Sequence, residues 1–341
     1  MTGRRLTRRQ QERIGRSQER RRERVGQGAE SLDEAGLGPE QTGLVIANYG
    51  RALIVEDGAG RLYRCAPRQN LGRLACGDRV VWQAASGGDG VVVAVGERRS
   101  LLTRSDYNGQ PRPVAANLDA VAVVLAPEPE PSEYLIDRYL VAIAALDVQG
   151  LLVLNKIDLL DPVTLAALIE RFEPYRRIGY PLLQASSHTA HGLDALSAWL
   201  RGRTSLLVGQ SGVGKSSLIK ALLPDREVRI QAVSQATGHG THTTSASTLY
   251  HLPDGGDLID TPGVRSFELG EISLNGLERG FPDLAPYLNR CRFADCRHET
   301  EPDCALREAV AGGEIAPRRL DSYRQLRAAL EATAKPRRQT S

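Results

Sequence analysis

The sequence predicts a multidomain protein in which an N-terminal β-barrel of the OB type precedes an α/β domain with a mainly parallel sheet and a small helical C-terminal domain. Three observations predict this fold class. Short valine-rich runs broken by glycine fill residues 39–105, strand and helix patterns alternate over residues 106–275, and residues 276–341 hold three Cys and a His at close spacing. At 341 residues the chain is long enough for several domains.

Residues 1–38 are predicted to form a basic, disordered tail. Residues 1–26 contain ten Arg against three Glu, a local charge of +7, although the whole chain carries only +3. With so few apolar side chains the tail cannot bury enough surface to fold. It is typical of an arm that binds nucleic acid, and the alternative is a solvated tail without a specific role.

The composition also bears on the cellular compartment. No apolar run is long enough to span a bilayer, and the Arg-rich N-terminus has no apolar core of the signal-peptide kind, so we expect a cytoplasmic protein that does not bind membranes. Five Cys, an odd number, argue against a disulfide framework. Cys65 and Cys76 have no partner at metal-ligand spacing and are expected to be core or surface thiols.

The barrel is predicted from five short strands in about sixty residues, with turns at Asp57-Gly58 and Gly87-Gly88. Barrels of this type commonly bind RNA or oligosaccharide, and a purely structural barrel is the alternative. The expected strands are Leu44–Ile46, Ala52–Val55, Leu62–Cys65, Arg79–Trp82 and Val91–Val95.

In the α/β domain, residues 118–125 and 151–154 are expected to be buried strands, and each is followed by a helix with a recognisable start. Ser132 can cap the first helix, and Asp161 with Pro162 provides a cap and an N1 proline for the second.

A Walker A sequence, G-x-x-x-x-G-K-[ST], begins at Gly209, between a short apolar strand and a helix that stops before Pro224. In this motif backbone N–H groups surround the phosphates, the Lys reaches the terminal phosphates and the Ser hydroxyl binds Mg²⁺. The expected phosphate-binding residues are Gly209, Gln210, Ser211, Gly212, Val213, Gly214, Lys215, Ser216 and Ser217.

The sequence Asn155-Lys156-Ile157-Asp158 follows the strand at 151–154 and has the form N-K-x-D. A carboxylate at Asp158 can accept two hydrogen bonds from the N1–H and 2-amino edge of guanine, a pair of donors that adenine lacks. Lys156 and Asn155 would hold the loop and the ring. Ser186 and Ser187, after the strand at 181–184, would supply the remaining loop on the base side, unless they are an ordinary strand end.

Asp260-Thr261-Pro262-Gly263 follows a strand expected over residues 257–259 and has the form D-x-x-G. In this motif Asp260 would hold Mg²⁺ through water and the Gly263 N–H would sense the γ-phosphate. The polar loop 238–244 precedes it and can place a Thr hydroxyl on Mg²⁺. These are the parts of a GTPase in a rotated order, because the base-recognition motif comes first and D-x-x-G comes last. The order predicts a circular permutation that leads from D-x-x-G straight into the C-terminal domain.

That C-terminal domain begins with the spacing Cys-x₄-Cys-x-His-x₅-Cys, a closed set of four soft ligands that predicts one structural Zn²⁺. A segment this short cannot hold itself by apolar burial, which is the situation that a metal resolves. A helix over about 317–332 and a basic end follow. The expected zinc ligands are Cys291, Cys296, His298 and Cys304.

Together, the barrel, the permuted nucleotide motifs with the loop Gly240–Thr244, and the Cys/His segment resemble the RsgA (YjeQ/EngC) family of bacterial GTPases over residues 40 to 335. The resemblance implies a circularly permuted P-loop GTPase that hydrolyses GTP to GDP and phosphate. It also implies stimulation by the small (30S) ribosomal subunit, contact with its 16S rRNA and a role in late 30S maturation. We further expect a monomer that binds no DNA.

The site itself indicates slow intrinsic hydrolysis. Many GTPases place a water-orienting Gln directly after D-x-x-G, whereas this chain has Val264. The resemblance assigns a catalytic His to position 242, with a loop His of no catalytic role as the alternative. His242, Lys215 and Thr244 are therefore the expected catalytic residues. The family loop usually has three Thr after this His, here Thr243, Thr244 and Ser245, and we favour Thr244 as the Mg²⁺ ligand.

Two other classes of function compete with a ribosome-assembly GTPase. The protein could be an RNA-binding assembly scaffold or checkpoint in which GTP is mainly a structural ligand, but the complete set of Lys215, Ser216, Asp260 and His242 favours hydrolysis. A GTPase that serves membranes or metal delivery is disfavoured by the Arg-rich tail and the lack of a lipid-binding stretch.

Overall fold

The computed structural model describes residues 37–50, 52–85, 88–105, 110–225, 247–261 and 272–334. Within this part of the chain, the fold divides into two compact units. The first contains residues 37–118 and 223–261, and the second contains residues 119–222 and 272–334. Both units are therefore assembled from two separate stretches of sequence. The expected domain boundaries at 38, 105 and 275 stay predictions.

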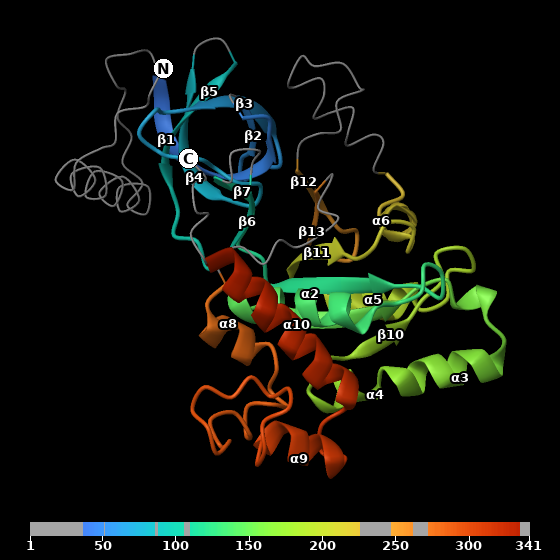
Figure 1. Cartoon of the computed structure of the whole chain (residues 1–341). Coiled ribbons are helices and arrows are strands. Elements are labelled where there is room, and N and C mark those ends of the chain that lie inside the picture. Colours follow the sequence, from blue (N-terminus) through green and yellow to red (C-terminus); the bar gives the residue numbers. More distant parts are fainter. Residues whose placement is uncertain are drawn as a thin grey trace, which may run out of the picture. The chain divides into compact units, whose positions relative to one another are not determined.

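Five strands of the first unit close into a barrel (Figure 1). Neighbours pair antiparallel except β3 and β5, which are parallel, and β1 pairs with both β2 and β4 to complete the ring. A bulge between Val45 and Ala47 lets β1 bend as it passes from one partner to the other. The expected OB-type barrel is thus confirmed, with the strands β1 Leu37–Asn48, β2 Leu53–Glu56, β3 Leu62–Pro67, β4 Arg79–Ala85 and β5 Gly90–Val95.

Trp82 fills the barrel and is fully buried. Two glycines face its indole ring: a Cβ at Gly43 would lie 2.9 Å from Trp82 Cδ1, and one at Gly90 would lie 2.7 Å from Trp82 Cε3. Val45, Val55 and other apolar side chains from alternate strand positions pack around the ring. The glycines thus make room for one large aromatic side chain in a small barrel. Cys65 and Cys76 are both buried, in keeping with core thiols.

Two hairpins complete the first unit. Strands β6 Leu101–Ser105 and β7 Pro111–Ala116 pair antiparallel, as do β12 Thr248–His251 and β13 Asp257–Asp260. The second hairpin joins the barrel, because Thr248 is in register with Ala47 of β1. The strand expected over residues 257–259 is confirmed as β13, whereas β6, β7 and β12 are additions to the expected set.

The second unit contains a parallel sheet in the order β10-β9-β8-β11. The chain passes from β8 outward through β9 to β10 and then returns to β11 on the other side of β8. The loops after β8 and β11 therefore leave the sheet at a topological switch point, where open α/β sheets bind their ligands. The strands are β8 Ala120–Leu125, β9 Gln149–Leu154, β10 Leu182–Gln184 and β11 Thr204–Val208.

The helices of this sheet follow the expected starts. The hydroxyl of Ser132 caps α2, and the carboxylate of Asp161 accepts from Val163 N and Thr164 N at the start of α3, with Pro162 at N1. Apolar residues of α2 such as Leu140 face the core. The helical segments are α2 Glu133–Leu146, η1 Ile157–Leu159, α3 Pro162–Arg171, α4 Glu173–Arg177, α5 Leu193–Leu200 and α6 Lys215–Leu222.

The C-terminal stretch of the second unit packs on α2. Helices α8 Leu274–Arg279, α9 Ala305–Ala311 and α10 Pro317–Ala334 enclose a core of their own, to which Val141 of α2 contributes. Helix α10 contacts α2 and α8 (Figure 1). The helix expected over 317–332 is confirmed.

Candidate functional site: nucleotide edge and metal cluster

The Walker A loop follows the buried strand β11 and runs into α6. Its first glycine lies against the neighbouring strand, since a Cβ at Gly209 would be 2.3 Å from the carbonyl oxygen of Val124. Lys215 Nζ donates to the carbonyl oxygens of Gly209 at 2.7 Å and Gln210 at 2.6 Å, so the ammonium lies over the loop. Ser216 and Ser217 are exposed at the start of α6. This arrangement suits a loop that binds phosphates.

Asn155 connects this loop to the loop after β10. Its side chain is fully buried, Nδ2 donates to the carbonyl oxygen of Val213 at 2.9 Å, and Oδ1 accepts from Ser187 N at 3.3 Å. The phosphate loop comes so close that a Cβ at Gly214, whose φ is +92°, would lie 2.3 Å from Asn155 Nδ2. One buried amide therefore joins the Walker A loop to the loop after β10.

Asp158 is an exposed carboxylate held at one oxygen. Ser186 Oγ donates to Asp158 Oδ1 at 2.5 Å. Ser186 is itself fully buried, and its Oγ accepts from the backbone N–H groups of His188 at 3.2 Å and Thr189 at 3.1 Å. The serine hydroxyl is thus oriented by the backbone and orients the carboxylate in turn. This is the geometry needed to present Asp158 to a ring with two adjacent donors.

Lys156 has a left-handed backbone with φ +61° and donates from Nζ to the carbonyl oxygen of Glu128 at 3.2 Å. A residue other than Gly in this region of φ and ψ is held there by its surroundings and is most often found at functional sites. Glu128 belongs to the loop after β8. The four loops that follow β8, β9, β10 and β11 therefore meet at one edge of the sheet.

The remaining residues predicted to bind nucleotide or to act in catalysis fall into two groups, one inside and one outside the described part of the chain. Asp260 is the half-buried last residue of β13, in the first unit. His242, Thr244 and Gly263 lie outside the described residues. Nucleotide binding by the residues of both groups, and by those of the sheet edge, stays a prediction.

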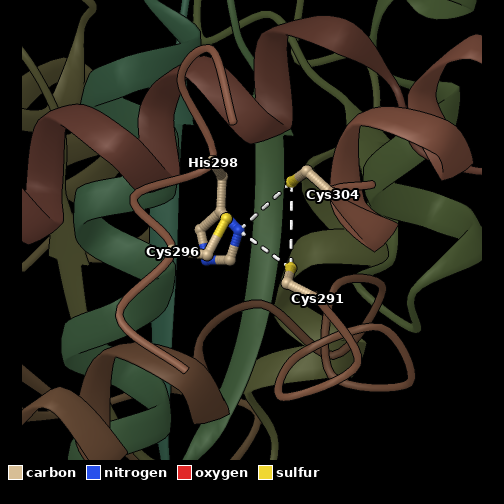
Figure 2. Close-up of side chains that lie close together, drawn as sticks. All are labelled: Cys291, Cys296, His298 and Cys304. Carbon is tan, nitrogen blue, oxygen red and sulfur yellow. Dashed lines mark hydrogen bonds between the residues drawn. The ribbon is translucent and has the colours of Figure 1, made fainter. Parts of the chain in front are cut away.

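The predicted zinc ligands form a compact cluster (Figure 2). The ligand atoms of Cys291, Cys296, His298 and Cys304 all lie within 4.8 Å of one another. Cys291 Sγ is 3.8 Å from Cys304 Sγ, and each of these two sulfurs is 3.4 Å from His298 Nδ1. A tetrahedral Zn²⁺ with its usual bond lengths would place two sulfurs about 3.8 Å apart and a sulfur and a nitrogen about 3.6 Å apart. The residues present therefore fit a metal ion such as zinc.

The surroundings of His298 favour metal binding as well. Burial, together with the nearby Arg327, lowers the pKa of His298 below its ordinary value and keeps the imidazole neutral. The neutral ring is the form that ligates. Cys304 directly precedes α9, and Cys291 lies on the irregular segment after α8, so the four ligands come from non-helical backbone that the metal would join.

Comparison with known proteins decides the family. The model of the RsgA GTPase family matches residues 95–270 of the chain. The "Small ribosomal subunit biogenesis GTPase RsgA" of Ectopseudomonas mendocina is 47% identical over 338 residues, which cover 97% of this chain and 98% of that relative. The chain belongs to the RsgA GTPase family. It is accordingly a GTP hydrolase, as the motifs indicated.

Two solved structures of similar proteins agree with this assignment. The crystal structure of YjeQ from Thermotoga maritima has a TM-score of 0.69 at 33% identity and covers 86% of this chain and 99% of its own. That of YloQ, described as a circularly permuted GTPase, has a TM-score of 0.65 at 29% identity and covers 90% of this chain and 100% of its own. The permuted order expected for the RsgA motifs is thereby confirmed.

The loops after β8, β9, β10 and β11 together form the nucleotide edge. Sequence patterns missed one part of it, the loop after β8. Its contact with Lys156 uses the carbonyl oxygen of Glu128, and a backbone acceptor leaves no signature in the amino-acid sequence. The rule that parallel strands direct their carboxyl ends to one edge was the signal that could have included this loop. Among the described residues, no helix combines the length and the apolarity needed to cross a membrane.

Proposed function

We propose that this GTPase binds the small ribosomal subunit, hydrolyses GTP faster when bound to it, and acts in late maturation of that subunit. The observation that carries the proposal is the 47% identity, over nearly the whole chain, to a relative named for small ribosomal subunit biogenesis. The anchored carboxylate of Asp158 supports guanine as the base. Since ribosomal subunits mature in the cytoplasm, the same proposal places the protein there.

The phosphates would be bound by the backbone N–H groups of the Walker A loop and by Lys215. Mg²⁺, which would neutralise charge on the β- and γ-phosphates, would be held by Ser216, Thr244 and, through water, Asp260. Exposure of Ser216 at the start of α6 supports its part in this set. Gly263 would sense the γ-phosphate through its N–H.

Hydrolysis would depend on the activator, because Val264 cannot orient or deprotonate water as a Gln in this position does. We assign the orienting role to His242 of the polar loop. Contact with the small subunit would complete a site that is inefficient in the free protein.

Binding to the ribosome would use RNA. The OB-type barrel belongs to an architecture that commonly binds oligonucleotides, and the +7 charge of residues 1–26 suits contact with the 16S rRNA phosphates. The zinc cluster would have a structural role, since four protein ligands leave no open position. We expect the protein to act as a monomer.

The decisive experiment measures steady-state GTP hydrolysis by the purified protein with and without isolated small subunits. Large subunits and ATP are the controls. Stimulation by one or more orders of magnitude, with small subunits and GTP only, is the expected result. Equal rates with and without subunits would contradict the proposal and favour an RNA-binding scaffold in which GTP is a structural ligand.

The contribution of the tail can be measured separately. Deleting residues 1–26 should weaken binding to small subunits and flatten the dependence of affinity on salt, because fewer counterions are released. If affinity and salt dependence are both unchanged, the tail is not an RNA-binding arm.

A further inference from the structure

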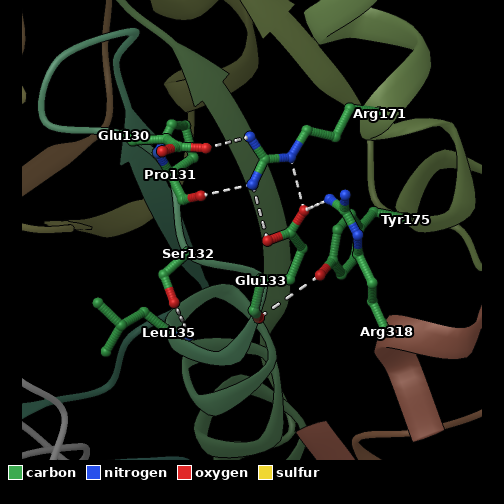
Figure 3. Close-up of polar contacts among 8 residues, drawn as sticks. All are labelled: Glu130, Pro131, Ser132, Glu133, Leu135, Arg171, Tyr175 and Arg318. Carbon is green, nitrogen blue, oxygen red and sulfur yellow. Dashed lines mark hydrogen bonds and ion pairs between the residues drawn. The ribbon is translucent and has the colours of Figure 1, made fainter. Parts of the chain in front are cut away.

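Glu133, the first residue of α2, is bound by arginines from two different helices (Figure 3). Arg171, at the end of α3, makes a bidentate contact: its Nε is 2.6 Å from Oε1 and its second terminal nitrogen is 2.8 Å from Oε2. Arg318, at the start of α10, donates to the same Oε1. Burial alone would raise the pKa of Glu133, but the hydrogen bonds from Arg171, the backbone and Arg318 lower it to about 2. The carboxylate of Glu133 is therefore ionised at neutral pH and is shared by Arg171 and Arg318.

The same arginine of α3 holds the loop between β8 and α2, residues 126–132. Arg171 donates to Glu130 Oε1 at 3.0 Å and to the carbonyl oxygen of Pro131 at 2.9 Å. A hollow of about 440 Å³ separates this loop from α3, with Leu168 among its lining residues, so apolar packing between the two is incomplete. The contacts of Arg171 with Glu130 and Pro131 therefore contribute much of what positions the loop. Its Glu128 carbonyl is the acceptor for Lys156 of the base-recognition motif.

Through Arg318, Glu133 is also connected to α10. This helix contacts the zinc segment, which is defined as residues 291–304. Near its start Arg319 is almost completely buried, donates to Asp137 of α2 and pairs with Asp283 at 2.7 Å. Further along the helix, Arg324 donates to the carbonyl oxygen of His298, and Arg327 donates to that of Cys296 at 3.1 Å. Helix α10 therefore binds α2 near its start and the backbone of two predicted metal-ligating residues along its middle.

We propose that Glu133 is a positioning residue that couples the zinc segment to the guanine-recognition motif, so that each sets the affinity of the other for its ligand. The contacts are contiguous. They run from the zinc ligands through α10 to Arg318 and Glu133, and from Glu133 through Arg171 and the loop 126–132 to Lys156. Coupling through such a network is reciprocal, because the free energy belongs to the pair of sites. The inference rests on the proposed binding of guanine nucleotide and zinc by these residues.

The first measurement is the dissociation rate of a fluorescent GDP from the full-length, zinc-loaded protein. Arg318→Gln removes the charge that joins α10 to Glu133 and leaves Arg171 in place. We expect dissociation to become about 5-fold faster, the lower end of common coupling strengths. Arg318→Lys keeps the charge and should restore most of the wild-type rate. The matched control is Arg176→Gln, which breaks the exposed pair with Glu173 on α4 and should change nothing.

The second measurement is the rate at which zinc passes to a chromogenic chelator, with and without saturating GDP. In the wild type GDP should slow zinc transfer, and in Arg318→Gln and Glu133→Gln this effect of GDP should disappear. A purely structural role would lower the thermal stability of the variants and leave the effect of GDP on zinc transfer intact, which would overturn the inference. If the wild type binds GDP and zinc but neither ligand changes the binding of the other, this inference fails and the proposed function is unaffected. If the wild type binds no GDP, the proposed function fails with it.

Discussion

The nucleotide edge and the zinc segment reach a defined geometry by opposite routes. At the nucleotide edge the polar side chains that join the loops, Asn155 and Ser186, are fully buried and saturated by contacts within the protein. In the zinc segment, residues 291–304, the buried residues are three of the four predicted metal ligands, and the rest of the segment is exposed or half-buried without a helix or strand up to Cys304. The nucleotide edge is thus held by contacts within the protein, whereas the zinc segment would rely on the metal that it is proposed to bind. Loss of ligand should therefore be tolerated at the first and disruptive at the second.

The largest expected effect comes from removing the zinc ion that the cluster is proposed to hold. Structural zinc sites bind with about 10–16 kcal/mol, and the zinc segment has little apolar burial to replace it. Cys304→Ser, or chelation of the wild type, should make Arg292 and Arg297 sensitive to trypsin, as digestion followed by mass spectrometry would show. GDP affinity should fall by no more than about tenfold, consistent with coupling of ordinary strength.

Cys65→Ala, which changes a buried thiol of the barrel, is the control and should leave the zinc content unchanged. Complete loss of GDP binding after zinc removal would show that the nucleotide edge is not independently built, and the contrast between the two regions would be wrong.

A change at the nucleotide edge should alter selectivity while the fold persists. Asp158→Asn removes a charged acceptor for the two guanine donors, and hydrogen bonds to charged groups contribute about 1.5–3 kcal/mol each. We expect GTP affinity to fall about 100-fold and xanthine nucleotide to be preferred, as measured by competition with a fluorescent nucleotide.

The matched control is Asp161→Asn, three residues away, where the carboxylate caps α3. It should cost a little stability and leave base selectivity as it is. A variant at Asp158 that still prefers GTP would remove this carboxylate from base recognition.

Changing the predicted catalytic residue should affect turnover, whereas changing the base-recognition residue should affect nucleotide affinity. His242→Ala should lower the turnover of the ribosome-stimulated reaction by about 100-fold or more, with little change in GTP affinity, because a positioned acid, base or orienting group acts in the transition state. His239→Ala, in the same loop, is the control. An unchanged stimulated rate in the first variant would exclude His242 from the mechanism.

The smallest effect is expected at a half-exposed cluster that serves neither ligand. His251 Nδ1 is 2.6 Å from Asp257 Oδ1, and Nε2 is 2.9 Å from Glu56 Oε1, so the ring joins β12 both to β13 and to the barrel strand β2. Hydrogen bonds to Asp257 and then to Glu56 raise the pKa of His251 to about 10. The folded pKa lies above the unfolded value, so the stabilisation is complete below pH 6.5 and is lost as the pH rises through 10.

His251→Gln should therefore lower the free energy of unfolding near pH 6 by about 1 kcal/mol or less, since the cluster is open to solvent. Near pH 10 the variant and the wild type should be closer in stability. Urea denaturation at the two pH values tests this, and an equal loss at both would show that packing of the ring, and not its charge, is what matters.

The sequence was most informative where the chemistry restricts both residue type and spacing. The Walker A loop, the N-K-x-D motif and the Cys/His segment each require particular side chains a few residues apart, and the five barrel strands carry an alternating pattern. The caps at Ser132 and Asp161 were equally local and were also found. In each case the physical cause of the structure lies within a short window of sequence.

What was missed depends on contacts between distant positions or on backbone atoms. Arg171 and Glu133 are separated by 38 residues, and Arg318 and Glu133 by 185, so no local pattern joins them. The hairpin β6–β7 was hidden because Pro111 and Pro113 lower the strand propensity of β7, and Thr248–His251 is too short to show a period. These elements become visible only once the sheet has brought them together.

The indole that fills the barrel also makes the chain unusually easy to observe. Only two Trp occur, and Trp82 lies in the first unit while Trp199 lies in the second, half-buried beside Arg203. Replacing either by Phe leaves a protein with one fluorophore, and the buried ring of Trp82 should emit at shorter wavelength than Trp199. Each unit thus carries its own optical reporter, so that the melting of the barrel and of the parallel sheet can be followed in separate variants without an added label.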